Sequence, residues 1–200
     1  MLNKAKMLAV WAMVAAVSSA AMGVSYTMDD KTVDLESWTG SGTSETVLVL
    51  DYNDVETNSG NGGTGNDVYY FGYRWDGSTK TVWDMMADIE ASESTLAFDK
   101  TDWGTPPDHN YFINGWAYST GNYVAQWSNN NEWVKEWLST DAETWTDGGG
   151  VSNDNIADDD WVGLVFQYNG SNDAPTVPEP ATMSLLALGG LATVLRRRRK

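Results

Sequence analysis

Residues 68–75 read Val-Tyr-Tyr-Phe-Gly-Tyr-Arg-Trp and form the clearest strand pattern in the chain. Aromatic side chains recur there at every second position, Tyr69, Phe71, Tyr73 and Trp75, so a β-strand would place all four on one face. We expect that face to be buried, because aromatic side chains fill sheets and bury large areas. The alternative is an exposed platform on which sugar rings stack.

Several other segments carry strand patterns. Residues 47–50 are continuously apolar, as in a strand inside a sheet. Residues 161–168 place apolar side chains on both faces, Val162, Leu164, Phe166 and Tyr168 on one and Trp161 and Val165 on the other. We expect further strands near residues 111–119, 123–127 and 133–138, the last two joined across residues 128–132. A helix over residues 132–138 is the alternative for the last of these.

One helix is expected, over residues 79–91. Its apolar side chains recur at spacings of three and four, and Ser78 or Thr81 can cap its N-terminus. These apolar positions are Val82, Met85, Met86 and Ile89. Between the apolar runs lie clusters of Gly, Asn, Asp, Ser and Thr, which are typical of turns. The sequence therefore predicts a mainly β (α+β) domain with an antiparallel sheet and one packed amphipathic helix.

Composition excludes much familiar chemistry. The 200 residues include 12 Lys and Arg, 28 Asp and Glu, one His and no Cys. Disulfides, thiolate metal sites and a cysteine nucleophile are therefore excluded. Between Tyr26 and Val177 five basic residues stand against 27 acidic ones. We expect no nucleic-acid partner, because phosphate binding needs clustered Lys and Arg.

The N-terminus has the three parts of a secretory signal peptide. Lys4 and Lys6 precede an apolar run at residues 7–17, and small residues follow at 18–21. We expect residues 1–23 to be a helical signal peptide and residues 24–174 to be the exported β-rich domain. An uncleaved N-terminal anchor is the alternative, although the run is short for a bilayer core of about 30 Å.

The C-terminus has a second tripartite pattern, over residues 175–200. Residues 177–180 read Val-Pro-Glu-Pro, residues 181–195 carry no charge, and a basic cluster ends the chain. The cluster consists of Arg196, Arg197, Arg198, Arg199 and Lys200. Fifteen helical residues reach roughly 22 Å, which spans a bilayer fully only where the flanking arginines snorkel and the bilayer thins. We expect a short transmembrane helix whose basic flank stays in the cytoplasm. A plain tail anchor is the alternative.

This tail resembles the PEP-CTERM sorting signal of Gram-negative envelope proteins. The matching elements are Val177, Pro178, Glu179 and Pro180, the short apolar helix and the basic cluster. The resemblance implies export by signal peptidase processing and transient anchoring in the inner membrane. An exosortase then recognises the Pro-Glu-Pro element and removes the tail. It also implies a final location at the cell surface or outside the cell, in association with extracellular polysaccharide.

The central segments also resemble exported domains of the transcobalamin C-terminal-like type. The segments that carry this resemblance are Thr81 to Met86, Ile113 to Tyr118, and Asp158 to Trp161. The resemblance implies a β-grasp-like arrangement of strands and one helix. No ligand is carried over from it.

Two tryptophans are candidate glycan contacts. Trp103 lies next to Gly104 and near two prolines, and Trp145 precedes the Gly148 to Gly150 run. Such loop-like contexts favour exposure, and an exposed aromatic ring can stack on a sugar.

Acidic residues offer candidate calcium sites. Residues 62–70 match one copy of the Gly-rich nonapeptide of calcium-binding β-rolls, with Asp67 as the carboxylate. Asp158 and Asp160 belong to a second acidic cluster that can hold a hard cation. The alternatives are a simple Gly/Asn-rich turn and solvated surface charge. We expect solvated charge for Asp51, Asp54 and Glu56 as well.

No catalytic motif is present, and we expect the protein not to be an enzyme. The nucleophile elbow, the zincin helix, the phosphate loop and the dinucleotide glycine pattern are all missing. A glycosidase would need only two facing carboxylates. We expect an exported cell-envelope or extracellular-matrix protein with a structural or adhesive domain. A carbohydrate-binding module, stabilised by calcium or not, is the alternative.

Overall fold

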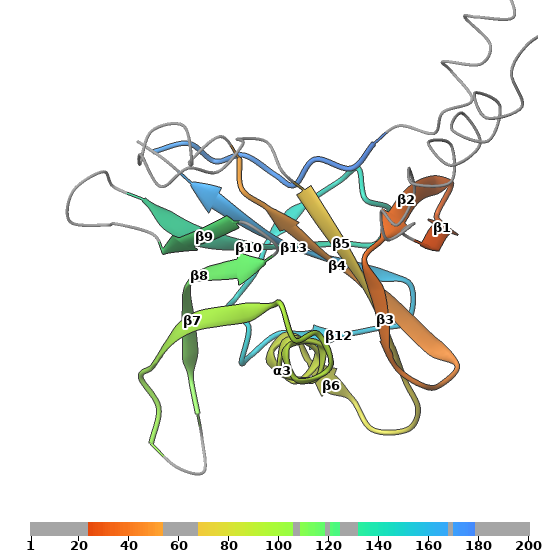
Figure 1. Ribbon diagram of the computed structural model, residues 1–200, viewed down its shortest axis with the longest axis horizontal. Coiled ribbons are helices and arrows are strands. Elements are labelled where there is room, and N and C mark those ends of the chain that lie inside the picture. The colour runs from red at the N-terminus through yellow and green to blue at the C-terminus, as the bar shows by residue number, and fades with distance from the viewer. Residues whose placement is uncertain are drawn as a thin grey trace, which may run out of the picture.

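The computed structural model describes residues 24–53, 68–105, 109–118, 121–124, 132–167 and 170–178. The predicted signal peptide, the Gly-rich loop with Asp67 and the tail beyond Pro178 lie outside these residues. Within the described ranges, no helix is long and apolar enough to cross a membrane. The described residues form a mainly β structure with one short helix (Figure 1).

A six-stranded sheet forms the centre of the fold, in the order β11-β10-β13-β4-β5-β3. Its strands are β3 (Ser37–Gly40), β4 (Ser44–Asp51), β5 (Val68–Trp75), β10 (Trp133–Ser139), β11 (Thr146–Asp147) and β13 (Asp160–Gln167). The pairs β4/β13 and β3/β5 are parallel and the other pairs are antiparallel. The sheet is therefore mixed, and the prediction of an antiparallel sheet was wrong.

The parallel pair explains this difference. β4 and β13 lie side by side at the sheet centre and are apolar on both faces, as is usual for strands covered on both sides. Parallel neighbours need a long crossover connection. The chain between β4 and β13 supplies it, since its described residues include α3 and eight strands, β5 to β12. Local turn signals point to hairpins and do not reveal such a crossover.

Smaller sheets complete the structure. β1 (Val24–Met28) pairs with β2 (Lys31–Leu35), and β6 (Lys80–Thr81) pairs with β12 (Asn155–Ile156). β7 (Ala97–Asp102), β8 (Tyr111–Tyr118) and β9 (Gly121–Val124) form a three-stranded sheet. β9 pairs with β8, whereas β10 pairs with β13 and β11, so the two strands predicted around residues 128–132 belong to different sheets.

The helix α3 spans Val82–Ser92, and its N-cap is Thr81 and not Ser78. The Thr81 hydroxyl accepts from the Asp84 backbone N–H, and the Asp84 carboxylate accepts from the Thr81 N–H, which is a capping box. The apolar positions of α3 are fully buried, as the spacing predicted. The strand over residues 133–138, rather than the alternative helix, is confirmed as β10.

The large sheet is covered on both faces. One face packs against α3 and the β7-β8-β9 sheet, in a core cluster that includes Phe71, Tyr73 and Trp75. The other face packs against the β1-β2 hairpin, in a cluster that includes Val47, Tyr70 and Trp161. The aromatic face of residues 68–75 is therefore core, as expected.

Four strands and the helix give a β-grasp-like unit. The strands run β10-β13-β4-β5, with the parallel pair in the middle and an antiparallel partner on each outer side. The helix α3 follows β5 and β6 in the chain and packs on one face of the sheet (Figure 1). This is the type of arrangement that the resemblance of the central segments implies.

Candidate functional site

A short segment after β13 is bound tightly to the sheet. We name residues 173–177 (Asp-Ala-Pro-Thr-Val) the C-terminal strap. It crosses the face that also carries the β1-β2 hairpin and contacts β13, β4 and β5 in turn. In Figure 1 it is the blue segment that follows β13 across the sheet. The strap leads directly into the sorting motif.

Its first residue is held by a fully buried amide. Gln167, at the end of β13, is 0% exposed. Its Nε2 donates to the Asp173 carbonyl at 2.8 Å, and its Oε1 accepts from the Asp173 N–H at 2.9 Å. Asn53 Nδ2 donates to the Asp173 carboxylate at 3.1 Å. Both backbone groups of Asp173 are therefore bonded to a single buried side chain.

A buried carboxylate holds the next anchoring point. Asp51, at the end of β4, is only 3% exposed. Its Oδ2 accepts from the Thr176 N–H at 2.9 Å, and its Oδ1 accepts from the Asn53 N–H at 2.8 Å. Burial raises the pKa of Asp51, and these hydrogen bonds from Thr176 and Asn53 act in the opposite direction. The prediction that Asp51 is solvated surface charge was wrong.

Two further contacts complete the attachment of the strap. Tyr70 of β5 donates its hydroxyl hydrogen to the Thr176 carbonyl at 2.8 Å. Pro175 is buried above Gly163 of β13, where an added Cβ would lie 2.1 Å from the proline Cγ. Only glycine allows this approach. Val177 packs against the core cluster beneath the β1-β2 hairpin.

The structure thus places the beginning of the sorting motif against the domain. Val177 is half-buried and Pro178 is exposed, while Glu179, Pro180 and the basic cluster (Arg196, Arg197, Arg198, Arg199 and Lys200) lie outside the described residues. The packed domain extends through Val177, three residues beyond the boundary at residue 174 that the sequence suggested.

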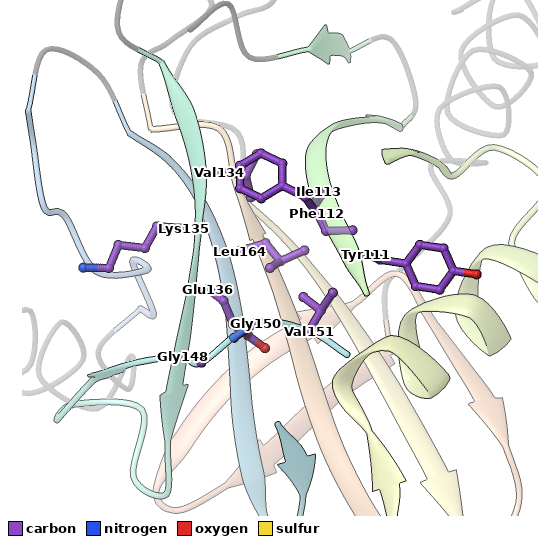
Figure 2. Close-up of a pocket in the computed structure, with 11 residues that line it drawn as sticks. Tyr111, Phe112, Ile113, Val134, Lys135, Glu136, Gly148, Gly150, Val151 and Leu164 are labelled. Carbon is purple, nitrogen blue, oxygen red and sulfur yellow. The ribbon is translucent and has the colours of Figure 1, made fainter. Parts of the chain in front are cut away.

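A cleft of about 290 Å³ opens elsewhere on the domain, between β8 and β10 (Figure 2). Its walls come from β8, β10, β13 and the loop that follows β11. They are formed by Tyr111, Phe112, Ile113, Val134, Lys135, Glu136, Gly148, Gly149, Gly150, Val151 and Leu164. Apolar side chains predominate, and Glu136 is the buried acidic group among them. Figure 2 shows the Lys135 side chain pointing away from the cleft.

Glu136 is only 8% exposed and is incompletely hydrogen-bonded. Its Oε2 accepts from the Gly150 N–H at 2.8 Å, whereas Oε1 is covered and has no partner in the described part of the chain. Burial, followed by the nearby charge of Asp154, raises the pKa of Glu136 to about 7. The loop approaches closely at Gly148, where an added Cβ would lie 2.5 Å from Glu136 Cγ.

A second cleft, of about 630 Å³, shares Tyr111 with the first and combines aromatic and polar side chains. The rings of Trp83 and Tyr111 lie 4.2 Å apart, and His109 stacks on Tyr111 at 5.5 Å. Asp84, Ser152 and Asn153 supply polar groups. Aromatic faces beside such groups can bind a sugar ring. We name this the aromatic cleft.

The two predicted glycan contacts differ in exposure. Trp103 is 75% exposed, and its neighbour Asp102 accepts a hydrogen bond from His109 that lowers the pKa of Asp102. The Trp103 N–H donates to the Asn110 carbonyl at 2.9 Å, one residue from His109, but Trp103 is not among the residues that line the aromatic cleft. Trp145 is half-buried and packs against the core cluster that contains Trp161.

The predicted calcium ligands are not gathered into one site in the described part of the chain. Asp158 accepts from the Glu45 N–H and so joins this loop to β4, whereas Asp160 accepts from the Ala157 N–H within a local turn. Asp67 lies outside the described residues. No group of three His, Asp or Glu side chains within those residues is arranged to hold a metal ion.

Sequence reasoning missed the residues that matter most here. Asp51, Tyr70 and Gln167 bind the strap, and Glu136 lies in the cleft. A weak signal existed, because polar residues in or at the end of predicted strands on the buried side usually need a partner. The partners themselves are far away along the chain and cannot be assigned from the sequence.

These features define a mainly β domain that is packed through Val177, the first residue of the Val-Pro-Glu-Pro segment. Comparison with known families finds the PEP-CTERM protein-sorting motif over residues 176–200. The chain therefore carries this motif at its C-terminus, which implies an exported, cell-surface-sorted protein that an exosortase processes. No curated protein and no solved structure matches the chain.

Proposed function

We propose that the mature domain is a structural or adhesive component of the cell envelope or extracellular matrix. The motif at residues 176–200 supports the route of delivery. The observation that carries the proposal is the docked strap, because it makes the β domain a self-contained unit up to the point where the tail begins. Such a unit stays folded when the tail is removed.

We assign no catalytic step to the domain. A glycosidase needs an acid that touches its substrate, together with a second facing carboxylate. Glu136 has the raised pKa of a general acid, but Oε2 is bonded to Gly150 and Oε1 is covered. Neither oxygen is presented to a substrate, so its placement favours a structural role.

Cell fractionation tests the delivery route. In a Gram-negative host with its exosortase, the tail-less domain should appear at the cell surface or in the medium. In the exosortase-deficient strain, the protein should keep its full tail and stay in the inner-membrane fraction. A full-length cytosolic protein in both strains would contradict the proposal.

A second candidate function is carbohydrate binding, which the aromatic cleft favours. Exposed rings stack on the apolar faces of sugars, and Trp103, which is 75% exposed, follows Asp102, the hydrogen-bond partner of His109 in the cleft. The acidic body would select neutral glycans, because anionic ones are repelled.

Affinity gels that contain neutral polysaccharides test this second function. Migration of the wild type should be retarded, and Trp103→Ala should weaken retardation severalfold with an unchanged melting temperature. Phe112→Ala is the matched control, since Phe112 is 49% exposed but lines the other cleft. Absence of retardation on every glycan would remove this function. If millimolar calcium leaves the melting temperature unchanged, the hypothesis that calcium stabilises the domain is contradicted.

A further inference from the structure

We propose that the outer edge of β1 pairs with β1 of a second copy of this chain, antiparallel across a two-fold axis at Tyr26. The contact is non-covalent and joins two domains into a dimer through main-chain hydrogen bonds. This inference goes beyond the proposed function, because it concerns contact between copies and does not depend on how the tail is processed.

The turn between β1 and β2 decides which backbone groups face outward. It consists of two residues, Asp29 and Asp30, whose φ angles of 50° and 62° are both positive. A two-residue hairpin loop with two positive φ angles is a type I′ turn, and the residues that flank it form a hydrogen-bonded pair. These flanking residues are Met28 and Lys31.

The remaining residues of β1 follow from that pair, because hydrogen-bonded and non-hydrogen-bonded pairs alternate in an antiparallel ladder. Met28 and Tyr26 therefore direct their N–H and C=O groups toward β2. Ser25 and Thr27 direct theirs to the opposite, outer side. Within the described ranges, β2 is the sole strand that pairs with β1, which lies at the margin of the molecule (Figure 1). The outer side is thus a row of unpaired donors and acceptors.

The sequence of β1 does nothing to block this edge, in contrast to β7. β7 is also an edge strand, and it carries Asp99, Lys100 and Asp102 together with a register shift between Asp99 and Lys100. Charges and bulges of this kind prevent edge-to-edge pairing. β1 reads Val-Ser-Tyr-Thr-Met, without a charge or a proline, and its register with β2 is unbroken. β1 is therefore an open template for a further strand.

A second β1 satisfies this edge by symmetry. An antiparallel pair centred on Tyr26 places Ser25 of one copy opposite Thr27 of the other, and both residues direct their backbone groups at the partner strand. Each Ser25/Thr27 pair exchanges two N–H···O bonds, and the two-fold axis produces two such pairs. The interface is isologous, so it closes at the dimer and leaves no edge for further growth.

Side chains and charges agree with the same register. Val24 is 54% exposed, one of the most exposed large apolar side chains of the described residues, and it would lie opposite Met28 of the second copy. The acidic turn, Asp29 and Asp30, comes at opposite ends of the antiparallel pair in the two copies. These carboxylates therefore do not face each other, although the protein as a whole is strongly acidic.

Sedimentation equilibrium over the micromolar range tests the inference, on protein purified from the exporting host. The wild type should show a monomer–dimer equilibrium. Thr27→Pro should raise the dissociation constant at least tenfold, because proline removes one outward N–H from each copy and leaves the bonds to β2 in place. Thr27→Val keeps the N–H and is the matched control. A wild type that stays monomeric, or a Thr27→Pro dimer as tight as the wild type, would overturn the inference.

Disulfide cross-linking tests the register and does not depend on the proline variant. The chain has no cysteine, so an introduced thiol can react only with another introduced thiol. Oxidation of a mixture of Ser25→Cys and Thr27→Cys proteins should link the two, because opposite residues lie within disulfide reach. Ser25→Cys alone is the matched control and should cross-link at least tenfold more slowly, since its two thiols would be offset along the strands. Equal rates in the mixture and in the control would contradict the proposed pairing.

Discussion

Asp51 and Glu136 are both buried carboxyl groups of the same sheet, yet their surroundings are opposite. Asp51 is 3% exposed and both of its oxygens accept backbone N–H groups, from Asn53 and Thr176. Glu136 is 8% exposed, and one of its oxygens has no partner in the described part of the chain. Burial is therefore nearly equal, and hydrogen bonding distinguishes the two sites.

The consequence is a difference in what each group does for the fold. The Asp51 carboxyl holds the strap through backbone N–H groups, and these bonds oppose the burial that raises the pKa of Asp51. Burial, and then the nearby charge of Asp154, disfavours the charged form of Glu136, which lies against the loop at residues 148–154. Asp51 attaches the strap, whereas Glu136 accepts from the Gly150 N–H of the loop through one oxygen only, within the described part of the chain.

The largest expected effect belongs to Glu136. Its pKa is about 7 in the folded protein, against an ordinary value of 4.5. The folded state thus binds more protons than the unfolded state between these values, and stability falls as pH rises from about 4.5 to 7. Glu136→Gln removes this cost, so at pH 8 the variant should be more stable by on the order of 3 kcal/mol. At pH 4 the two proteins should be nearly equal.

Denaturant unfolding at pH 4, 6 and 8 measures this difference. Asp34→Asn is the control, because it removes an exposed carboxylate and should leave the dependence of stability on pH unchanged. Lys135 does not interfere, since its ammonium group pairs with Asp147 at 2.8 Å and lies over Trp137. If the free energy of unfolding of the wild type stays constant from pH 5 to 8, Glu136 does not destabilise the fold as proposed, and it does not differ from Asp51 in this respect.

The next largest change in stability is expected at Asp51, where the substitution should lower the free energy of unfolding rather than raise it. Asp51→Asn keeps the size of the side chain but turns an N–H donor toward another donor, at Asn53 or Thr176. We expect a loss of roughly 2 kcal/mol in the free energy of unfolding at pH 7, because a buried N–H loses its acceptor. Urea unfolding measures the loss. A stability gain like that of Glu136→Gln would show that the two carboxyls are equivalent.

Much of this fold was predictable from local pattern. The alternation at residues 68–75, the spacing at residues 81–89 and the apolar faces of residues 161–168 gave β5, α3 and β13. β1, β2, β3 and β7 were missed, as were the two-residue strands β6, β11 and β12, because several are short and polar at alternate positions, as in the partly exposed β7. β6 lies within the predicted helix at residues 79–91, whose first three residues are therefore not helical. The parallel β4/β13 pair is a long-range property that no local window contains.

The candidate sites were less predictable, for a physical reason. The motif at residues 177–180 consists of consecutive residues, so it could be identified directly from the sequence. Asp51 is 125 residues from Thr176 in the chain, and its side chain becomes a buried acceptor only when the sheet brings the strap to it. The same holds for Glu136 and Gly150, which meet only once the loop folds against β10.

The smallest expected loss of stability is that of Tyr70→Phe, a substitution at the strap that changes no charge. Tyr70→Phe removes only the hydroxyl that donates to the Thr176 carbonyl. We expect a loss of about 1 kcal/mol, the usual value of one hydrogen bond between neutral groups. The carbonyl can regain water at the strap's edge, so the loss should be smaller than for Asp51→Asn. Urea unfolding and amide exchange at Thr176 measure the change. Equal losses in the two variants would mean that the carboxylate has no special part in holding the strap.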